Sequence, residues 1–310
     1  MAWSMSSVGE VNELERMMRE KLSDGVTAMP ITMDGFPPSA PPSSSVIKRV
    51  SKWQDEVMLI PHEAFRMYMG WMEVAVASFH PTLTGHAWKP AVFFQWYNDW
   101  FYPAVHEHIS SMSSLFFPAL EEICGEFPRD KSSADHEELI RRMNGIRDME
   151  SVFVDAEGDF TKITAAVQEL QQQVKDFRKF MTEHFAWEEK IVPQMLLEKG
   201  IPKPTVDALT QQIIQRRGLS GNALLLPGIL YALHSWAGDE GVEQLRSEMP
   251  SRIRFLNDKV WDRAWRKKSL GVIRSIIADE DPEDQRKPMM DVLLCSCLAN
   301  NLSSQDLMLL

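Results

Sequence analysis

Apolar residues recur every three or four positions along the middle of the chain, the spacing of a helix face packed against other helices. The clearest series begins with six apolar members: Ile163, Val167, Leu170, Val174, Phe177 and Met181. The next two positions of the same series are His184 and Glu188, after which Ile191 and Met195 continue it. The pattern therefore predicts an imidazole and a carboxylate that lie one turn apart and point into a helical core.

Ionisable groups in such a core need partners, because burying them unpaired costs on the order of several kcal/mol. His184 and Glu188 have the i, i+4 spacing that brings two side chains together on one helix face, where they can share a metal ion. A hydrogen-bonded His–Glu pair would meet the same need. The choice depends on whether other helices direct His or Glu residues inward at a matching depth.

Three other segments with helical periodicity show the same feature. We expect helices at about 46–79, 90–124 and 133–154, followed by the helix at 159–198, with Pro61 causing a kink or a new start in the first. Each has one histidine in phase with its apolar face: His62, His108, His136 and His184. The sequence thus predicts an all-α protein, an up-down four-helix bundle, and favours a metal centre inside it.

The second of these helices contains two histidines, of which only one can face the core. Its apolar series reads Phe101, Val105, His108, Met112, Leu115 and Ala119. His106 lies about 200° from His108 around the helix axis, so the helical phase selects His108. Pro103 lies close upstream and can rotate the register. In that case His106 and the adjacent Glu107 become the ligands.

Several short motifs accompany the four histidines. They are, in chain order, His62 with Phe65 and Arg66, the run Leu115–Pro118, His136 at the start of a helix, and His184-x-x-x-Glu188-Glu189 before Pro193. Over about residues 46–198 these motifs resemble the hemerythrin-like, or HHE cation-binding, family. The resemblance implies a four-helix bundle around a carboxylate-bridged non-heme di-iron centre. Members bind or sense oxygen, iron, nitric oxide or redox state, and a few are catalytic.

The resemblance also implies roles for individual residues. The terminal metal ligands would be His62, His108 or His106, His136 and His184. Glu188 or Glu189 would bridge the two ions. Glu107 would replace a carboxylate that the family places one turn after the histidine of the second helix.

The chain departs from the family pattern at three positions. Met112 follows His108 by one turn, and Ser110 follows His106, where the family has a glutamate. Ile140 stands one turn after His136, where a second histidine is expected. A site with five or six ligands, a mononuclear site and a degenerate site therefore stay open.

The flanking segments differ from the bundle in composition. Residues 1–45 contain a run with five prolines and repeated serines, which predicts a mobile or surface-draped segment. Residues 199–310 predict a helical extension, similar to that of longer hemerythrin-like proteins. Within it, a short helix should end at Gly218, and the apolar segment Val292–Leu298 should dock as a last helix.

Composition narrows the class of protein further. A formal net charge of -11 argues against a nucleic-acid binder. Three scattered cysteines form no disulfide framework and fit a reducing compartment. The chain has no uncharged apolar stretch of about 18 residues and no signal-peptide pattern, so we expect no transmembrane segment and no secretion. The sequence indicates a soluble, cytoplasmic protein of unspecified oligomeric state.

The leading functional hypothesis is binding of non-heme iron, two ions, for oxygen binding, iron or oxygen sensing, or redox chemistry. Dioxygen or another small molecule would be the ligand at the metal. The residues alone do not separate iron from manganese or zinc. One alternative is a helical interaction protein with a degenerate site, which Met112, Ser110 and Ile140 favour. Another is a di-iron oxidase acting on an organic substrate, with the aromatic second helix lining its pocket.

Overall fold

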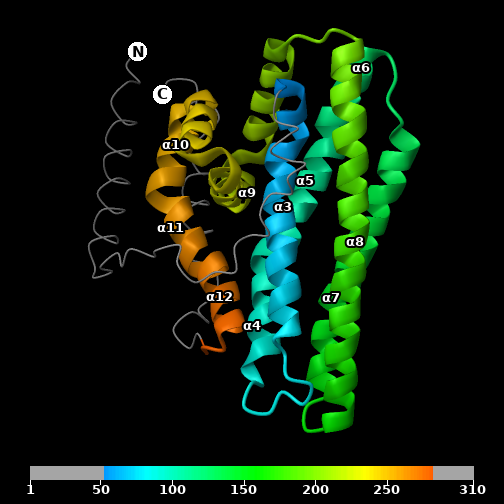
Figure 1. Cartoon of the computed structure of the whole chain (residues 1–310), viewed down its shortest axis with the longest axis vertical. Helices are drawn as coiled ribbons and strands as arrows, with labels where there is room; N and C mark the ends of the chain where they lie inside the picture. The colour runs from blue at the N-terminus through cyan, green and yellow to red at the C-terminus, as the bar shows by residue number, and fades with distance from the viewer. Residues whose placement is uncertain (1–51, 282–310) are drawn as a thin grey trace, which may run out of the picture. The chain divides into compact units, whose positions relative to one another are not determined.

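Helices joined by short turns make up residues 52–281, the part of the chain that the computed structural model describes (Figure 1). No strand occurs within these residues, so the all-α prediction is confirmed there. Six helical stretches account for most of this range. Within the same residues, no helix has the length and apolar character needed to cross a membrane.

The first stretch is α3, Trp53–Ala77. It runs through Pro61 without beginning anew there, so the alternative of a second start at this proline is wrong. Six residues that recur along one face of α3 at intervals of three or four are all buried: Met58, His62, Phe65, Met69, Met72 and Val76. The recurrence of apolar residues every three or four positions therefore marks the packed face of α3.

The second stretch alternates between α-helix and single π-helical turns. Its parts are α4 (Trp88–Trp96), η1 (Tyr97–Phe101), α5 (Tyr102–Ser111), η2 (Met112–Phe116) and α6 (Phe117–Cys124). Each π turn precedes a segment with proline in its first turn, Pro103 in α5 and Pro118 in α6. Proline donates no backbone hydrogen bond and crowds the preceding turn, and a widened turn accommodates it.

The second π turn also changes which residues face inward. Up to Met112 the buried positions follow the predicted series. Beyond it, Leu115 and Ala119 are only partly buried, whereas Phe116 and Leu120 are buried. Leu115 and Ala119 therefore pack at the edge of the core rather than in its centre, because the π turn adds a residue to the helical repeat.

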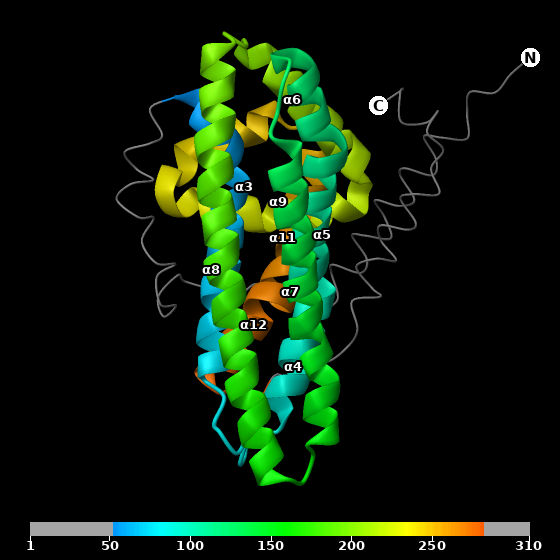
Figure 2. The ribbon, with the colours of Figure 1, turned by 90° about the vertical axis from the view of Figure 1, so that its right-hand side faces the viewer.

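The third and fourth stretches are α7 (Arg129–Asp155) and α8 (Phe160–Glu198). Asp159 caps α8 by accepting hydrogen bonds from the backbone N–H groups of Thr161 and Lys162. A short turn before this cap joins the two helices, which lie side by side (Figure 2). α8 packs against both α3 and α7, and α4 and α5 also contact α7.

The remaining described helices pack against this set. α9 (Lys203–Glu248) is interrupted at Gly218 (φ 62°, ψ -162°) and Gly238 (φ 65°, ψ -165°), so the predicted helix end at Gly218 is confirmed. It contacts α3 and α5. A last stretch from Ser251 to Ala278 ends in α12 (Gly271–Ala278), which contacts α3 and α4. The expectations for residues 1–45 and 292–298 fall outside the described residues.

A close approach between α9 and α3 provides a test of this packing. A Cβ atom at Gly228 would lie 2.4 Å from Oη of Tyr68, a buried side chain whose oxygen accepts a hydrogen bond from Nε1 of Trp265 at 2.5 Å. We expect Gly228→Ala to lower the free energy of unfolding by about 1–3 kcal/mol, because Tyr68 is not free to move. Urea denaturation measures this change.

The matched control is Gly70→Ala in α3, where a Cβ atom meets nothing within 4 Å. That substitution should be neutral or stabilising by up to about 1 kcal/mol, since alanine is the better helix former. Equal unfolding free energies for the two variants would contradict the close contact between α9 and α3.

Candidate metal centre

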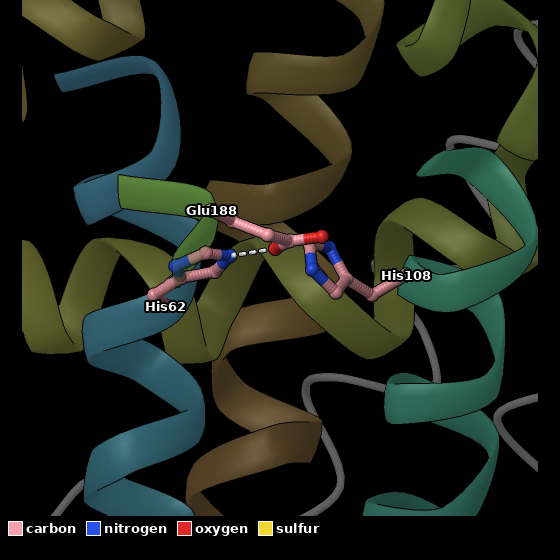
Figure 3. A group of neighbouring side chains, drawn as sticks. All are labelled: His62, His108 and Glu188. Atoms are coloured by element: carbon pink, nitrogen blue, oxygen red, sulfur yellow. Dashed lines mark ion pairs between the residues drawn. The ribbon is translucent and has the colours of Figure 1, made fainter. Parts of the chain in front are cut away.

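Four histidines and one glutamate from four different helical stretches meet in the interior. Each occupies a position in the apolar series of its helix, and this places all five side chains in the core. Their exposed fractions are His62 0%, His108 3%, His136 4%, His184 3% and Glu188 0%. Figure 3 shows three of them, with His62 from α3 and His108 from α5 pointing towards Glu188 from α8.

Glu188 lies between two pairs of imidazoles. Its Oε2 is 3.1 Å from Nε2 of His62, while its Oε1 is 3.2 Å from Nε2 of His184 and 3.6 Å from Nε2 of His136. Two groups of three ligand atoms result, His62–His108–Glu188 and His136–His184–Glu188, each with all atoms within 4.8 Å of one another. Both groups use the same carboxylate.

Three atoms at the centre have no hydrogen-bond partner in the described part of the chain. Both carboxylate oxygens of Glu188 and Nε2 of His62 are fully buried, and none of them makes a hydrogen bond within residues 52–281. The neighbouring imidazoles approach within contact distance but outside hydrogen-bond geometry. The close imidazoles offset the cost of burying this carboxylate in part, and a bound cation between the oxygens and the Nε2 atoms would supply the partners that they lack. The donor set therefore fits a metal.

The other nitrogen of His62 is held from outside the centre. Its Nδ1 lies 2.9 Å from Oε1 of Glu189, and Nη2 of Arg66 donates to the same oxygen at 2.7 Å. Arg66 also pairs with Glu63. This chain of contacts fixes the ring so that Nε2 faces Glu188, the arrangement in which an outer carboxylate orients a metal-binding histidine.

His184 and His136 have outer partners of the same kind. Nδ1 of His184 lies 3.2 Å from Oδ2 of Asp135, and Lys131 donates to that oxygen at 2.6 Å. Nδ1 of His136 lies 2.7 Å from Oγ of Ser113. Three of the four imidazoles thus engage Nδ1 outwards and direct Nε2 to the centre, which leaves Nε2 as the metal-facing atom.

The electrostatics of the centre favour the metal-binding protonation state of Glu188 and His108, whereas His184 must lose a proton to bind a metal. Burial would raise the pKa of Glu188, but the surrounding His136, His184 and His62 hold it well below its usual range. Burial, and then the neighbouring His62, lowers the pKa of His108 well below its usual value. Burial also acts to lower the pKa of His184, and Glu188 and Asp135 outweigh it and raise that pKa. Glu188 is therefore ionised and His108 neutral, as metal ligands must be.

Aromatic rings surround the centre. Phe185 stacks on His62 with ring centroids 3.9 Å apart, and Phe65 lies 5.0 Å from the ring of His108. Both phenylalanines are buried. These rings keep the environment of the imidazoles and of Glu188 apolar, which strengthens electrostatic interactions there.

The structure places the other predicted ligands outside both groups. His106 is exposed and stacks on Tyr102, with ring centroids 6.2 Å apart. Glu107 is partly buried and accepts a hydrogen bond from Oγ of Ser111 at 3.3 Å. Glu189 contacts His62 from outside the centre. Pro103 does not rotate α5 enough to exchange the two histidines, so His108 faces inward as the phase predicts.

Two polar residues near the site were not identified from the sequence. Asp135 precedes His136 directly, yet its carboxylate contacts His184 on the neighbouring helix. Ser113 lies in the η2 turn, whose geometry the periodicity does not reveal. Only the pairing of α7 with α8, and of η2 with α7, brings these groups to the imidazoles.

Comparison of the chain with models of protein families, with curated proteins and with solved structures finds no match. The function is therefore inferred from the residues and their geometry.

Proposed function

We propose that this centre binds two non-heme iron ions. His62 and His108 would be ligands of one ion, His136 and His184 of the other, and Glu188 would bridge them. The position of Glu188 carries the proposal, because its two oxygens face different imidazole pairs and have no hydrogen-bond partner among the described residues. A buried bridging carboxylate lowers the cost of placing two cations close together.

We further propose that α3, the stretch 88–124, α7 and α8 form a hemerythrin-like four-helix bundle. Each contributes at least one of the five side chains, and α8 packs against both α3 and α7. Metal centres built between facing helices, with ligands from all of them, are typical of such bundles. α9 and the helices after it would be the added C-terminal extension.

The donor set is compatible with iron, and the family resemblance favours iron over the other metals that these donors accept. Neutral imidazoles with a carboxylate suit both Fe(II) and Fe(III), although manganese and zinc accept the same donors. When bound, iron would supply reversible oxygen binding or electron transfer. The chain's own part is to orient the imidazoles through Glu189, Asp135 and Ser113, and to exclude water with Phe65 and Phe185. We therefore propose an oxygen-binding, oxygen- or iron-sensing, or redox role.

A second candidate function, oxidation of an organic substrate, is favoured by a cavity that reaches His108. The opposing hypothesis is an interaction protein with a degenerate site, which the departures at Met112, Ser110 and Ile140 still favour. Two measurements distinguish these hypotheses. A degenerate site would take up no metal, and an oxidase would turn over a substrate.

Metal analysis is the direct test. Full-length protein expressed with iron and purified without chelator should contain about two iron ions per chain and show an oxygen-dependent visible absorption band. Chelator-treated protein is the control and should lose both. Zinc or manganese in place of iron would change the metal assignment, and protein without any transition metal would overturn the proposal.

The outer carboxylate Glu189 provides a graded prediction. Glu189→Ala should weaken metal affinity about 10- to 100-fold without abolishing binding, because the ring of His62 loses its orienting partner but the ligands remain. Competition with a chromogenic chelator measures the affinity, and Glu183→Ala, an exposed position on the same helix, is the control. Complete loss of one ion in Glu189→Ala would instead make Glu189 a ligand.

A further inference from the structure

A cavity of about 170 Å³ lies between the N-terminal half of α3, the α5–η2 region and the first part of α9. Most of its walls are apolar, including Val57, Met58, Met112, Phe116, Ile213 and Ile229. His108 also lines it, so the cavity borders the candidate metal centre. An apolar protein cavity of about 150 Å³ holds a benzene molecule, and this one therefore has room for a ring or a short branched chain.

Arg217 places a positive charge in this apolar wall. Its Nε donates a hydrogen bond to Oγ of Ser111 at 3.1 Å. That hydroxyl donates to Glu107 at 3.3 Å, so within residues 52–281 Glu107 acts on Arg217 through Ser111 and by its charge rather than in a direct ion pair. Burial lowers the pKa of Arg217 to about 10, and the charge of nearby Glu107 opposes this only in part. A largely buried guanidinium without an ion pair is suited to receive an anionic ligand.

The opposite end of the cavity is more exposed and carries mainly acidic groups. Lys203 there pairs with Asp207 at 2.8 Å and Glu248 at 3.6 Å, and Glu56 lies on the same wall. The charge at this end does not attract an anion. Recognition of one would depend on Arg217, whose apolar surroundings strengthen a charge–charge interaction relative to water.

We propose that this cavity binds a small monocarboxylic acid with an apolar body about the size of a benzene ring. The carboxylate would take both terminal nitrogens of Arg217, and the body would lie against the apolar walls beside His108. Binding requires only the cavity and Arg217. That the ligand is a substrate or an effector of the metal centre rests on the proposed function.

Benzoate is the probe, titrated calorimetrically into full-length protein in chelator-treated and iron-loaded forms. We expect a Kd of about 1 mM or tighter for the wild type, increased about tenfold to a hundredfold in Arg217→Gln. Arg216→Gln, which removes an exposed arginine from the neighbouring position, should leave the Kd unchanged. Benzyl alcohol, which has the ring but no charge, should bind the wild type and Arg217→Gln equally weakly.

A second variant keeps the test decisive if Arg217→Gln does not fold. Val57→Trp fills the cavity without altering Arg217 and should also remove benzoate binding. No binding to the wild type at about 10 mM benzoate, or equal binding to Arg217→Gln or Val57→Trp, would overturn the cavity proposal. Iron analysis of the same samples separates the two proposals. Benzoate binding without iron uptake rejects only the metal centre, and iron uptake without benzoate binding rejects only the cavity.

Discussion

Glu188→Ala is expected to reduce the iron content from about two ions per chain to about zero, a larger loss than removing any one histidine causes. The reason is geometric, because Oε2 faces His62 while Oε1 faces His184 and His136, so one substitution removes a ligand from both ions. Elemental analysis of protein expressed with iron measures the loss.

Two matched variants sharpen this result. Glu183→Ala changes an exposed glutamate of the same helix and should retain the wild-type iron content. His62→Ala removes a ligand from one group only and should leave the His136–His184 side able to hold an ion. Retention of one tightly bound ion in Glu188→Ala would contradict the bridging position. Full retention would remove Glu188 from the metal site.

The sequence was most informative where a single helical phase persists. In α8 the series of apolar residues runs without interruption into His184 and Glu188, and all of its members from Val167 to Glu188 are buried. The distinction between Glu188 and Glu189 follows from the same phase, since adjacent residues point about 100° apart. One faces the centre and the other contacts His62 from outside.

Prediction failed where the helix changes its repeat. Phase placed His108 on the buried face because α5 is regular between Pro103 and Ser111. The π turn that follows then exchanged Leu115 for Phe116 as the core residue. A π turn depends on local crowding and on the tertiary contacts that favour it. The spacing of apolar residues at three and four positions does not contain that information.

Contacts between helices were the other missing information. Asp135 and Arg217 are ordinary charged residues in the sequence, and each gains its role only from the helix opposite. Asp135 on α7 contacts His184 on α8, and Arg217 on α9 contacts Ser111 on α5. Helical phase places a residue on a face of its own helix, whereas the partner of that face depends on how the helices pack.

The presence of metal should decide which protein is more stable, the wild type or the double variant His184→Leu/Glu188→Met. In chelator, wild-type protein retains a buried carboxylate whose oxygens have no hydrogen-bond partner in the part of the chain that the structure describes. Replacing buried charged groups by apolar side chains of similar volume stabilises by about 1–4 kcal/mol. The metal-free double variant should therefore melt above the metal-free wild type, by about 2–4 °C for each kcal/mol.

Adding Fe(II) under anaerobic conditions should reverse this order. A ligand at about 1,000 times its Kd stabilises the folded state by about 4 kcal/mol, so the melting temperature of the wild type should rise above that of the double variant, which should not respond. Thr182→Leu/Ala186→Met places the same residues at exposed positions with the same spacing on α8, and it should respond to Fe(II) as the wild type does. Thermal melting followed by circular dichroism tests all three proteins. A wild type that melts at the same temperature with and without Fe(II), beside a double variant that always melts higher, is the behaviour of a degenerate bundle. It would count decisively against the metal centre, because a folded protein that binds a metal ion must become more stable when the metal is supplied.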